Sequence, residues 1–263
     1  MWTAWKGAVI GELVGQTPET LMPIPHASWA HCYDFAYENN YGARYRGLTD
    51  STISTVRDLA SPPCSLVDFG AGTGRLAIPL AAAGYAVTAV EPCQEMVEFL
   101  RSKATAAGVQ VESRVQRMQD FDGQGQFDVA LCVFTTVLYL LDEASMNQGL
   151  TRLAQSLKRA GRLLIDIPRR DVFQSRSNCL GRDVLDRKVT VTPAGDDLYT
   201  YDENTRCLMD GRWQDCKDTF SIRFWPTATI LSVLQQNGVE CEGPIAAGLQ
   251  GTGADYYTGR KTG

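Results

Sequence analysis

The chain has 263 residues, of which 44% are hydrophobic and 21% are charged, and its net charge is -5. A chain of this length accommodates one domain with an insertion or a small cap, and its apolar content supports a sizeable core. The acidic balance, with lysine and arginine scattered along the sequence, argues against a nucleic-acid partner.

The first 60 residues are predicted to form an N-terminal extension followed by a helical lid. Prolines among the first 25 residues exclude one long helix there, whereas residues 33–59 have a helical pattern with a kink at Gly42. Tyrosines spaced by four put phenols along one helical stripe, namely Tyr33, Tyr37, Tyr41 and Tyr45. Such a stripe either packs only against its neighbours or closes over a reaction centre, and both interpretations stay open.

A glycine motif follows a predicted strand over residues 65–69. Gly70, Gly72 and Gly74 are spaced G-x-G-x-G, one residue tighter than the G-x-G-x-x-G of dinucleotide sites. Asp68, just before the turn, would repel a pyrophosphate but suits a cationic ligand. The pattern therefore favours S-adenosylmethionine, which carries an ammonium and a sulfonium and no phosphate. A glycine turn that serves only packing is the alternative.

The following segments alternate between helix and strand. A helix over 74–83 leads to a strand over 86–91, which ends in Glu91, a carboxylate able to accept from both ribose hydroxyls. This alternation predicts a parallel sheet with helices on both faces. Residues 116–126 are too few for a helix, so that crossover is predicted to be a loop. The remaining predicted strands are 109–115, 127–133 and 161–167, and the remaining helices are 93–107 and 142–159.

Residues 169–225 break the alternation and are predicted to form an antiparallel insert. Asp210-Gly211 is a hairpin signal inside it. A helix over 226–237, closed by Gly238, and a final hairpin would complete the main sheet. The predicted strands of the insert are 187–192, 198–201, 206–209 and 216–225, and those of the final hairpin are 239–246 and 254–260.

Four segments, in order, resemble the motifs of class I S-adenosylmethionine-dependent methyltransferases: residues 67–74, 88–92, 127–134 and 161–168. The resemblance runs from about Tyr33 to the C-terminus, and the aromatic entry helix and the insert look most like glycine and amino-sugar N-methyltransferases. It implies an α/β fold with a Rossmann-like, doubly wound, seven-stranded sheet and a C-terminal antiparallel hairpin, plus the antiparallel insert and the N-terminal helical lid. The expected domain boundaries are 1–60, 61–168, 169–225 and 226–263.

The resemblance also implies the cofactor contacts, with S-adenosylhomocysteine as product. Arg117 stands where the family often has an acid that accepts from adenine, so backbone contacts from Met118 or Gln119 are expected instead, with Asp120 as an alternative acid. The expected cofactor residues are Asp68, Gly70, Ala71, Gly72, Thr73, Gly74, Arg75, Glu91, Pro92, Met96, Arg117, Met118, Gln119, Val133, Phe134, Thr135 and Leu138.

Catalytic candidates lie in and before the lid. His26 and His31 are the only histidines, and with an ordinary pKa near 6.5 either can act as general base, or be simply packed. The resemblance adds Tyr33 and Tyr37 as lid residues over the sulfonium. No nucleophilic residue is required, because methyl transfer is an in-line displacement on an activated methyl group.

Acceptor contacts are expected after the fifth strand. Arg169, Arg170 and Asp171 either favour an anionic acceptor or form a solvated loop. Aromatic residues of the insert either cover the acceptor or form the insert's own core; they are Tyr199, Tyr201, Trp213 and Trp225.

We therefore expect an enzyme that methylates nitrogen or oxygen of a small molecule, as a monomer or homodimer. The alternatives are a protein side-chain methyltransferase, which needs an open cleft, and a non-catalytic S-adenosylmethionine-binding protein. The eight cysteines form no C-x-x-C pair, so free thiols and no metal are expected. No segment is long and apolar enough to span a bilayer and none resembles a signal peptide, so a cytoplasmic protein without a membrane partner is expected.

Overall fold

The computed structural model describes residues 24–174, 176–245, 249 and 253–263, with side chains of 176–182 excepted. Within these residues, seven strands form the main sheet in the order β10-β11-β5-β4-β1-β2-β3. The strands β1 to β5 are parallel, whereas β11 runs antiparallel to β5 and β10 antiparallel to β11. This confirms the Rossmann-like fold and its antiparallel C-terminal hairpin. The bounds are β1 Ser65–Phe69, β2 Ala86–Glu91, β3 Glu112–Val115, β4 Phe127–Cys132, β5 Leu157–Pro168, β10 Val239–Ile245 and β11 Ala254–Lys261.

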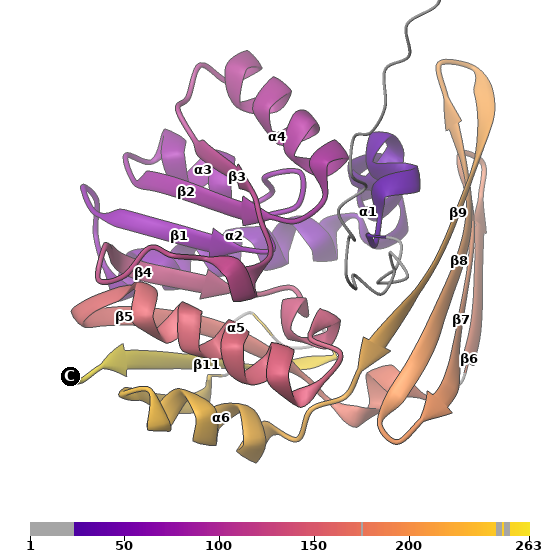
Figure 1. Cartoon of the computed structure of the whole chain (residues 1–263). Coiled ribbons are helices and arrows are strands. Elements are labelled where there is room, and N and C mark those ends of the chain that lie inside the picture. Colours follow the sequence, from indigo (N-terminus) through magenta and orange to yellow (C-terminus); the bar gives the residue numbers. More distant parts are fainter. Residues whose placement is uncertain (1–23, 175, 246–248, 250–252) are drawn as a thin grey trace, which may run out of the picture.

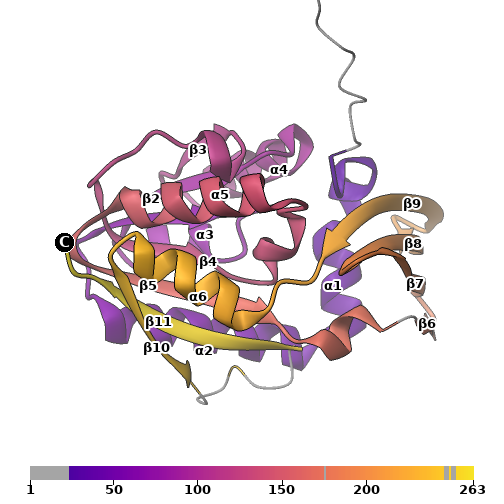
Figure 2. The same ribbon diagram turned by 60° about the horizontal axis from the view of Figure 1, so that its bottom comes forward.

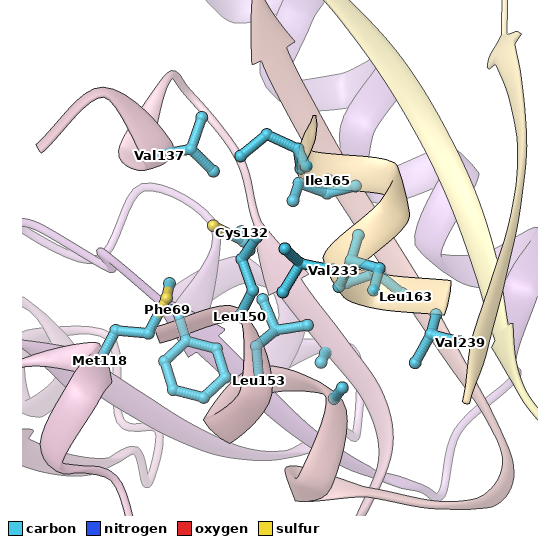
Figure 3. Packing of buried hydrophobic residues seen from close by; sticks show 14 of the residues in the cluster. Phe69, Met118, Cys132, Val137, Leu150, Leu153, Leu163, Ile165, Val233 and Val239 are labelled. Atoms are coloured by element: carbon cyan, nitrogen blue, oxygen red, sulfur yellow. The ribbon is translucent and has the colours of Figure 1, made fainter. Parts of the chain in front are cut away.

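Helices cover both faces of this sheet (Figure 2). On one face lie α5 (Glu143–Ser156) and α6 (Thr227–Gln236), whose Leu150 and Val233 belong to the same buried cluster as Ile165 of β5 (Figure 3). On the other face lie α2 (Ala43–Leu59), α3 (Ala77–Ala82) and α4 (Gln94–Ala106), with Leu48, Leu80 and Leu100 in a second cluster. A sheet buried on both faces explains why its strands are almost continuously apolar.

The strand order reverses beside β1, between β4 and β2. In open α/β sheets a ligand binds outside the carboxyl ends of the strands at such a reversal. The loop from 116 to 126, too short for a full helix, holds only the 3-10 turn η2 (Met118–Asp120). No full helix in this loop therefore covers the carboxyl ends of β3 and β4.

In the described part of the chain, a second sheet of four antiparallel strands follows β5, in the order β6-β7-β8-β9 (Figure 1). We call it the cap. Its strands are β6 (Arg176–Arg182), β7 (Leu185–Gly195), β8 (Leu198–Met209) and β9 (Arg212–Arg223). Two details of the prediction were wrong. Strand β6 was missed, and the two short strands predicted on either side of Asp202 are one continuous strand. The polar residues between them stay in the strand because Asp202 pairs with Thr190 of β7 and Thr219 of β9.

The lid comprises the 3-10 helix η1 (Ala27–Cys32) and α1 (Tyr33–Tyr41). Gly42, with a φ of +51°, separates α1 from α2, so the helical pattern breaks at the predicted position. Figure 1 shows α1 between the main sheet and the cap. No helix in the described segments has the length and apolar character needed to cross a bilayer. The prolines at 18 and 23 lie outside the described residues.

Candidate active site

Two cavities meet beside the carboxyl ends of the parallel strands in the described part of the chain. The glycine-loop cavity, about 340 Å³, borders the turn after β1. The cap cavity, about 580 Å³, lies among α1, the loops after β4 and β5, and strands β7 to β9. Four side chains line both cavities: His26, Phe134, Tyr139 and Phe220. Ligands in the two cavities would therefore face each other across this shared wall.

The glycine turn brings backbone to the edge of the first cavity. Gly70, Gly72 and Gly74 have φ values of +75°, +55° and +88°. A Cβ on Gly70 would lie 2.4 Å from Oγ1 of Thr136, whereas a Cβ on Gly72 would meet nothing within 4 Å. Gly70 therefore allows close packing of two loops, and Gly72 faces open space where a side chain would intrude on a ligand.

Glu91 ends β2 beside this turn and lines the same cavity. Its Oε2 accepts from the Gly72 N–H at 2.9 Å and its Oε1 from the Cys93 N–H at 3.0 Å. Burial raises the pKa of Glu91, and these two N–H donors oppose that rise. A carboxylate has about four acceptor positions, so a fixed pair of oxygens can still accept from a diol.

Asp68 lies under the turn and does not border the cavity, since only 3% of its surface is exposed. Burial raises the pKa of Asp68 to about 7, while Arg75 opposes the rise. A cationic group at the turn would favour the ionised form of this carboxyl. The predicted ammonium contact of Asp68 stays a prediction.

Two further predicted cofactor residues bind the helices that precede the glycine loop in the chain. Oγ1 of Thr73 donates to Oδ1 of Asp34 in α1 at 2.6 Å, and Asp34 also pairs with Lys103. Nη1 of Arg75 donates to Oγ1 of Thr49 at 3.0 Å, and its guanidinium lies 4.7 Å from the centre of the Phe134 ring. The glycine loop is thus hydrogen-bonded to the lid through Thr73 and to α2 through Arg75.

The loop after β3 forms another wall of the glycine-loop cavity, where Arg117, Met118 and Gln119 meet it. Asp120 is not among the lining residues. Of the predicted cofactor residues, those that line the cavity are Gly70, Gly72, Glu91, Pro92, Met96, Arg117, Met118, Gln119 and Phe134. Asp68, Ala71, Thr73, Gly74, Arg75 and Val133 lie behind it, and Thr135 and Leu138 line the cap cavity instead.

The loop after β4 is held by a buried carboxyl that the sequence analysis missed. Phe134 and Thr135 have φ values of +64° and +66°, unusual for residues with a side chain. Asp166 of β5 accepts from the Thr135 N–H at 2.8 Å, which fixes this turn. Burial raises the pKa of Asp166 to about 7.

The lid tyrosines form one contiguous aromatic group. The rings of Tyr33 and Tyr37 stack with centroids 4.5 Å apart, and Tyr37 lies 5.7 Å from Tyr41 and 5.6 Å from Tyr45. Tyr33 borders the glycine-loop cavity, whereas the other three border the cap cavity. The stripe therefore both packs and lines the site, and its catalytic role stays a prediction.

His26 lies at the shared wall. Its Nε2 is 2.7 Å from the Tyr139 hydroxyl, and its side chain is 14% exposed. Burial, with repulsion from the cationic Arg187, lowers the pKa of His26 to about 3. The assumption of an ordinary pKa was therefore wrong for this residue. An imidazole with so low a pKa is a weak general base, so His26 is better suited to positioning groups by hydrogen bonding than to accepting their protons.

His31 lies outside both cavities. It is exposed, and its Nε2 is 3.7 Å from Sγ of Cys216 in β9. Nothing in this position brings it to a ligand at the shared wall, so His26 is the histidine that the site can use.

Arg187, which lines the cap cavity, belongs to a buried ion pair. Nε of Arg187 donates to Oε1 of Glu203 at 2.6 Å, and the two side chains are 6% and 1% exposed. The same guanidinium donates to the hydroxyls of Tyr41 at 3.3 Å and Tyr201 at 3.2 Å. These bonds use three of the five N–H donors of an arginine.

Asn40 of α1 also lines the cap cavity, and it is 6% exposed. Neither its Oδ1 nor its Nδ2 has a hydrogen-bond partner. A buried amide without partners costs about 1–3 kcal/mol. A polar ligand with both donors and acceptors would remove that cost.

The remaining acceptor candidates divide between the cavity and the surface. Arg169 and Asp171 line the cap cavity, whereas Arg170 turns outward to Asp197, at 2.8 Å. Tyr201 lines the cavity as well. The other aromatic candidates do not: Trp213 is 43% exposed, Trp225 lies in the main core, and Tyr199 packs on Phe173.

Comparison with known proteins agrees with this geometry. Residues 66–161 match the family model described as a methyltransferase domain. A protein of Geobacillus sp. (strain WCH70), provisionally named as a methyltransferase, is 35% identical over 102 residues, which are 39% of this chain and 41% of that protein. The chain thus aligns with less than half the length of this relative.

Two solved structures resemble nearly the whole chain. An S-adenosylmethionine-dependent methyltransferase from Clostridium acetobutylicum ATCC 824 has a TM-score of 0.77 at 16% identity, covering 89% of this chain and 99% of that one. A sugar N-methyltransferase from Streptoalloteichus sp ATCC 53650 has a TM-score of 0.70 at 18% identity, covering 100% of both chains. These likenesses establish a shared fold that includes the lid and the cap.

Proposed function

We propose that the chain is a class I S-adenosylmethionine-dependent methyltransferase, because residues 66–161 match a methyltransferase domain and the fold is Rossmann-like, and that it methylates nitrogen or oxygen of a small polar molecule bound in the cap cavity. The cofactor of this domain is S-adenosylmethionine, which supplies a methyl group activated by a positive sulfur. The residues described above fit it: Gly72 leaves room for a ligand, and Glu91 offers fixed acceptor oxygens.

One observation carries the proposal: the two cavities share a wall. Phe134 and Tyr139 border both spaces, so a nucleophile in the cap cavity has access to a group at the end of the glycine-loop cavity. Displacement at a methyl group needs an approach of about 3–3.5 Å in line with the leaving group. Two adjoining cavities support such an approach, which needs no covalent enzyme intermediate.

The side chains at the wall exclude water and orient the acceptor. Phe220 of the cap packs against His26, with ring centroids 5.0 Å apart, and against Tyr139 at 5.8 Å. This aromatic surface removes water from the space where the nucleophile reacts. His26, held uncharged, can align an acceptor N–H or O–H through Tyr139.

The polar lining supports a polar acceptor over a flat aromatic one. Asn40 offers one carbonyl and one amino group without partners, and Arg187 has donors left beyond its hydrogen bonds to protein. A molecule with several hydroxyl or amino groups pairs with such a surface. Together with the similarity to a sugar N-methyltransferase, this favours an amino sugar as the first acceptor to test.

The test has two stages. Calorimetry should show binding of S-adenosylmethionine and S-adenosylhomocysteine and no binding of NAD. Mass spectrometry should then detect addition of one methyl group to amino sugars but not to matched sugars with hydroxyl in place of the amine. Binding of cofactor without transfer to any acceptor in the panel would contradict the amino-sugar assignment, and binding of NAD alone would contradict the methyltransferase itself.

A further inference from the structure

Outside both cavities, the lid and the cap meet through a cluster of sulfur and imidazole side chains. Cys32 ends η1, next to His31, and Cys216 lies on β9. A ring nitrogen of His31 and the two Sγ atoms all lie within 4.8 Å of one another. These donors come from segments more than 180 residues apart in the chain.

A fourth donor adjoins them. Cys207 of β8 belongs to the same buried cluster as Cys32 and Cys216, and the side chains of Cys32 and Cys207 are completely buried. Cys207 and Cys216 belong to neighbouring strands, because Cys216 pairs with Thr205 and Cys207 with Gln214. Three sulfurs and one imidazole are the donor set of closed, four-coordinate zinc sites.

The distances among His31, Cys32 and Cys216 are close to those that a metal ion needs, and Cys207 would complete the set from the adjoining strand. Zinc binds sulfur at about 2.3 Å, so two sulfurs on one tetrahedral ion lie about 3.8 Å apart. Sγ of Cys32 is 3.0 Å from Sγ of Cys216, which is 3.7 Å from Nε2 of His31. The sulfur pair would have to separate by less than 1 Å on binding, roughly the range of a small side-chain rotation.

The surroundings suit a soft ion held for structure. Cys216 is 4% exposed and Cys32 0%, so both sulfurs are shielded from water, while His31 is exposed and leaves a route for the ion. Thiolates and imidazole select zinc over calcium or magnesium, which prefer oxygen.

We propose that His31, Cys32, Cys207 and Cys216 form a zinc site that joins the lid to the cap. Sequence analysis predicted no metal, because none of these cysteines stands in a C-x-x-C pair and the donors converge only after the cap has folded against the lid. The site lies apart from both cavities, so it is independent of the methyl acceptor and of the proposed function.

The experiment measures the metal content of the full chain, purified with a thiol reductant. Elemental analysis should find about one zinc ion per chain, which chelation removes with a fall in melting temperature. His31→Ala, at an exposed position, and Cys216→Ser should each lower zinc affinity by about tenfold or more. Cys64→Ser and Cys241→Ser, which change cysteines outside the cluster, should retain wild-type zinc.

Cobalt gives a second readout that does not depend on the stability of a variant. Cobalt added to metal-free protein should produce the sulfur-to-metal absorption of a thiolate site and the visible bands of tetrahedral geometry, weakened in Cys207→Ser and Cys216→Ser. Wild-type protein that binds neither ion while it is folded would overturn the proposal. So would zinc content that is equal in His31→Ala, Cys216→Ser and the controls, or a Cys32–Cys216 disulfide found by mass spectrometry in place of the metal.

Discussion

The glycine-loop cavity and the cap cavity share four side chains, yet they are assembled in different ways. One side of the first cavity comes from loops at the ends of three adjacent parallel strands, between Gly70 and Gln119. The second draws its walls from positions as far apart as Asn40, Arg187 and Gly253. The first takes its glycine turn and Glu91 from local motifs and only part of its wall from the lid and the cap, whereas the second consists largely of residues brought together when lid, core and cap are docked. Damage to the cap should therefore affect stability and acceptor use, and damage to the glycine loop should affect cofactor binding.

The largest effect is expected at the buried ion pair of the cap. Arg187→Met leaves the Glu203 carboxylate buried without its cation, so the free energy of unfolding should fall by about 3–5 kcal/mol. The exposed pair Arg206–Asp215 of the same sheet is the matched control, and Arg206→Met should cost at most about 1 kcal/mol. Chemical denaturation measures both. Equal losses in the two variants would show that the cap cavity does not depend on this pair.

In the glycine-loop cavity, Glu91→Ala should weaken binding of S-adenosylmethionine by about 1.5–3 kcal/mol, because it removes a charged acceptor. Calorimetry would record this as a rise in Kd of about 10- to 150-fold. Glu98→Ala, an exposed change on α4, is the control. Unchanged affinity in folded Glu91→Ala protein would refute the ribose contact.

The shared wall should give the protein a pH signature. His26 has a pKa of about 3 when folded and an ordinary value of 6.5 when unfolded, so the unfolded chain binds more protons between these values. Stability from this residue is present above pH 6.5 and is lost as the pH falls, by about 2 kcal/mol at pH 5. Asp68 and Asp166, whose folded pKa values are raised to about 7, act in the opposite sense between their ordinary value of 3.8 and pH 7.

Comparison of variants isolates the histidine. Between pH 6.5 and pH 5, the free energy of unfolding of His26→Gln should fall by about 1.6 kcal/mol less than that of wild type. Denaturation at each pH measures the difference. Parallel curves for wild type and His26→Gln would mean that His26 titrates normally.

A smaller effect is expected from the amide of the cap cavity. Asn40→Ala should lower kcat/KM for the acceptor by about tenfold, the loss of a typical hydrogen bond, with cofactor affinity unchanged. Melting temperature should not fall, since this amide has no protein partner. Asn39→Ala is the neighbouring control, because its amide donates to the Phe35 carbonyl within α1. If Asn40→Ala lost stability and kept acceptor use, Asn40 would be structural.

The smallest effect is expected at Trp213. This side chain is exposed and packs on Arg206, with the guanidinium 5.2 Å from the ring centre. Trp213→Ala should therefore leave both acceptor and cofactor affinity within about twofold of wild type. A large loss of acceptor affinity would show that the hairpin of β8 and β9 contributes to acceptor binding at Trp213.

The parts that could be predicted are those in which sequence neighbours become spatial neighbours. Parallel strands end at one edge of a sheet, so the position of Glu91 after its strand was enough to place it beside the glycine turn. Strand boundaries at Ser65–Phe69 and Ala86–Glu91 were predicted to the residue, because both segments are apolar and bounded by turn residues.

The cap cavity resisted prediction because its properties depend on burial across distant segments. In the sequence, nothing distinguishes Arg187 from a solvent-exposed arginine on a strand. Only the pairing of β7 with β8 brings Glu203 next to it. The low pKa of His26 likewise needs the docked cap, which supplies both the burial and the nearby charge. The alternation at 187–192 did indicate a half-buried strand, and an arginine on its inward face was the available signal.

Asp34 accepts from Thr73 of the glycine loop and pairs with Lys103 of α4, so the lid is fastened to the very loop that borders the cofactor. A lid attached in this way cannot open without releasing a bond to that loop. Opening of the lid and loosening of the glycine loop are then linked by one coupling free energy, which has the same size in both directions. A ligand that orders the loop would stabilise the closed lid, and opening of the lid would weaken binding of that ligand by the same factor.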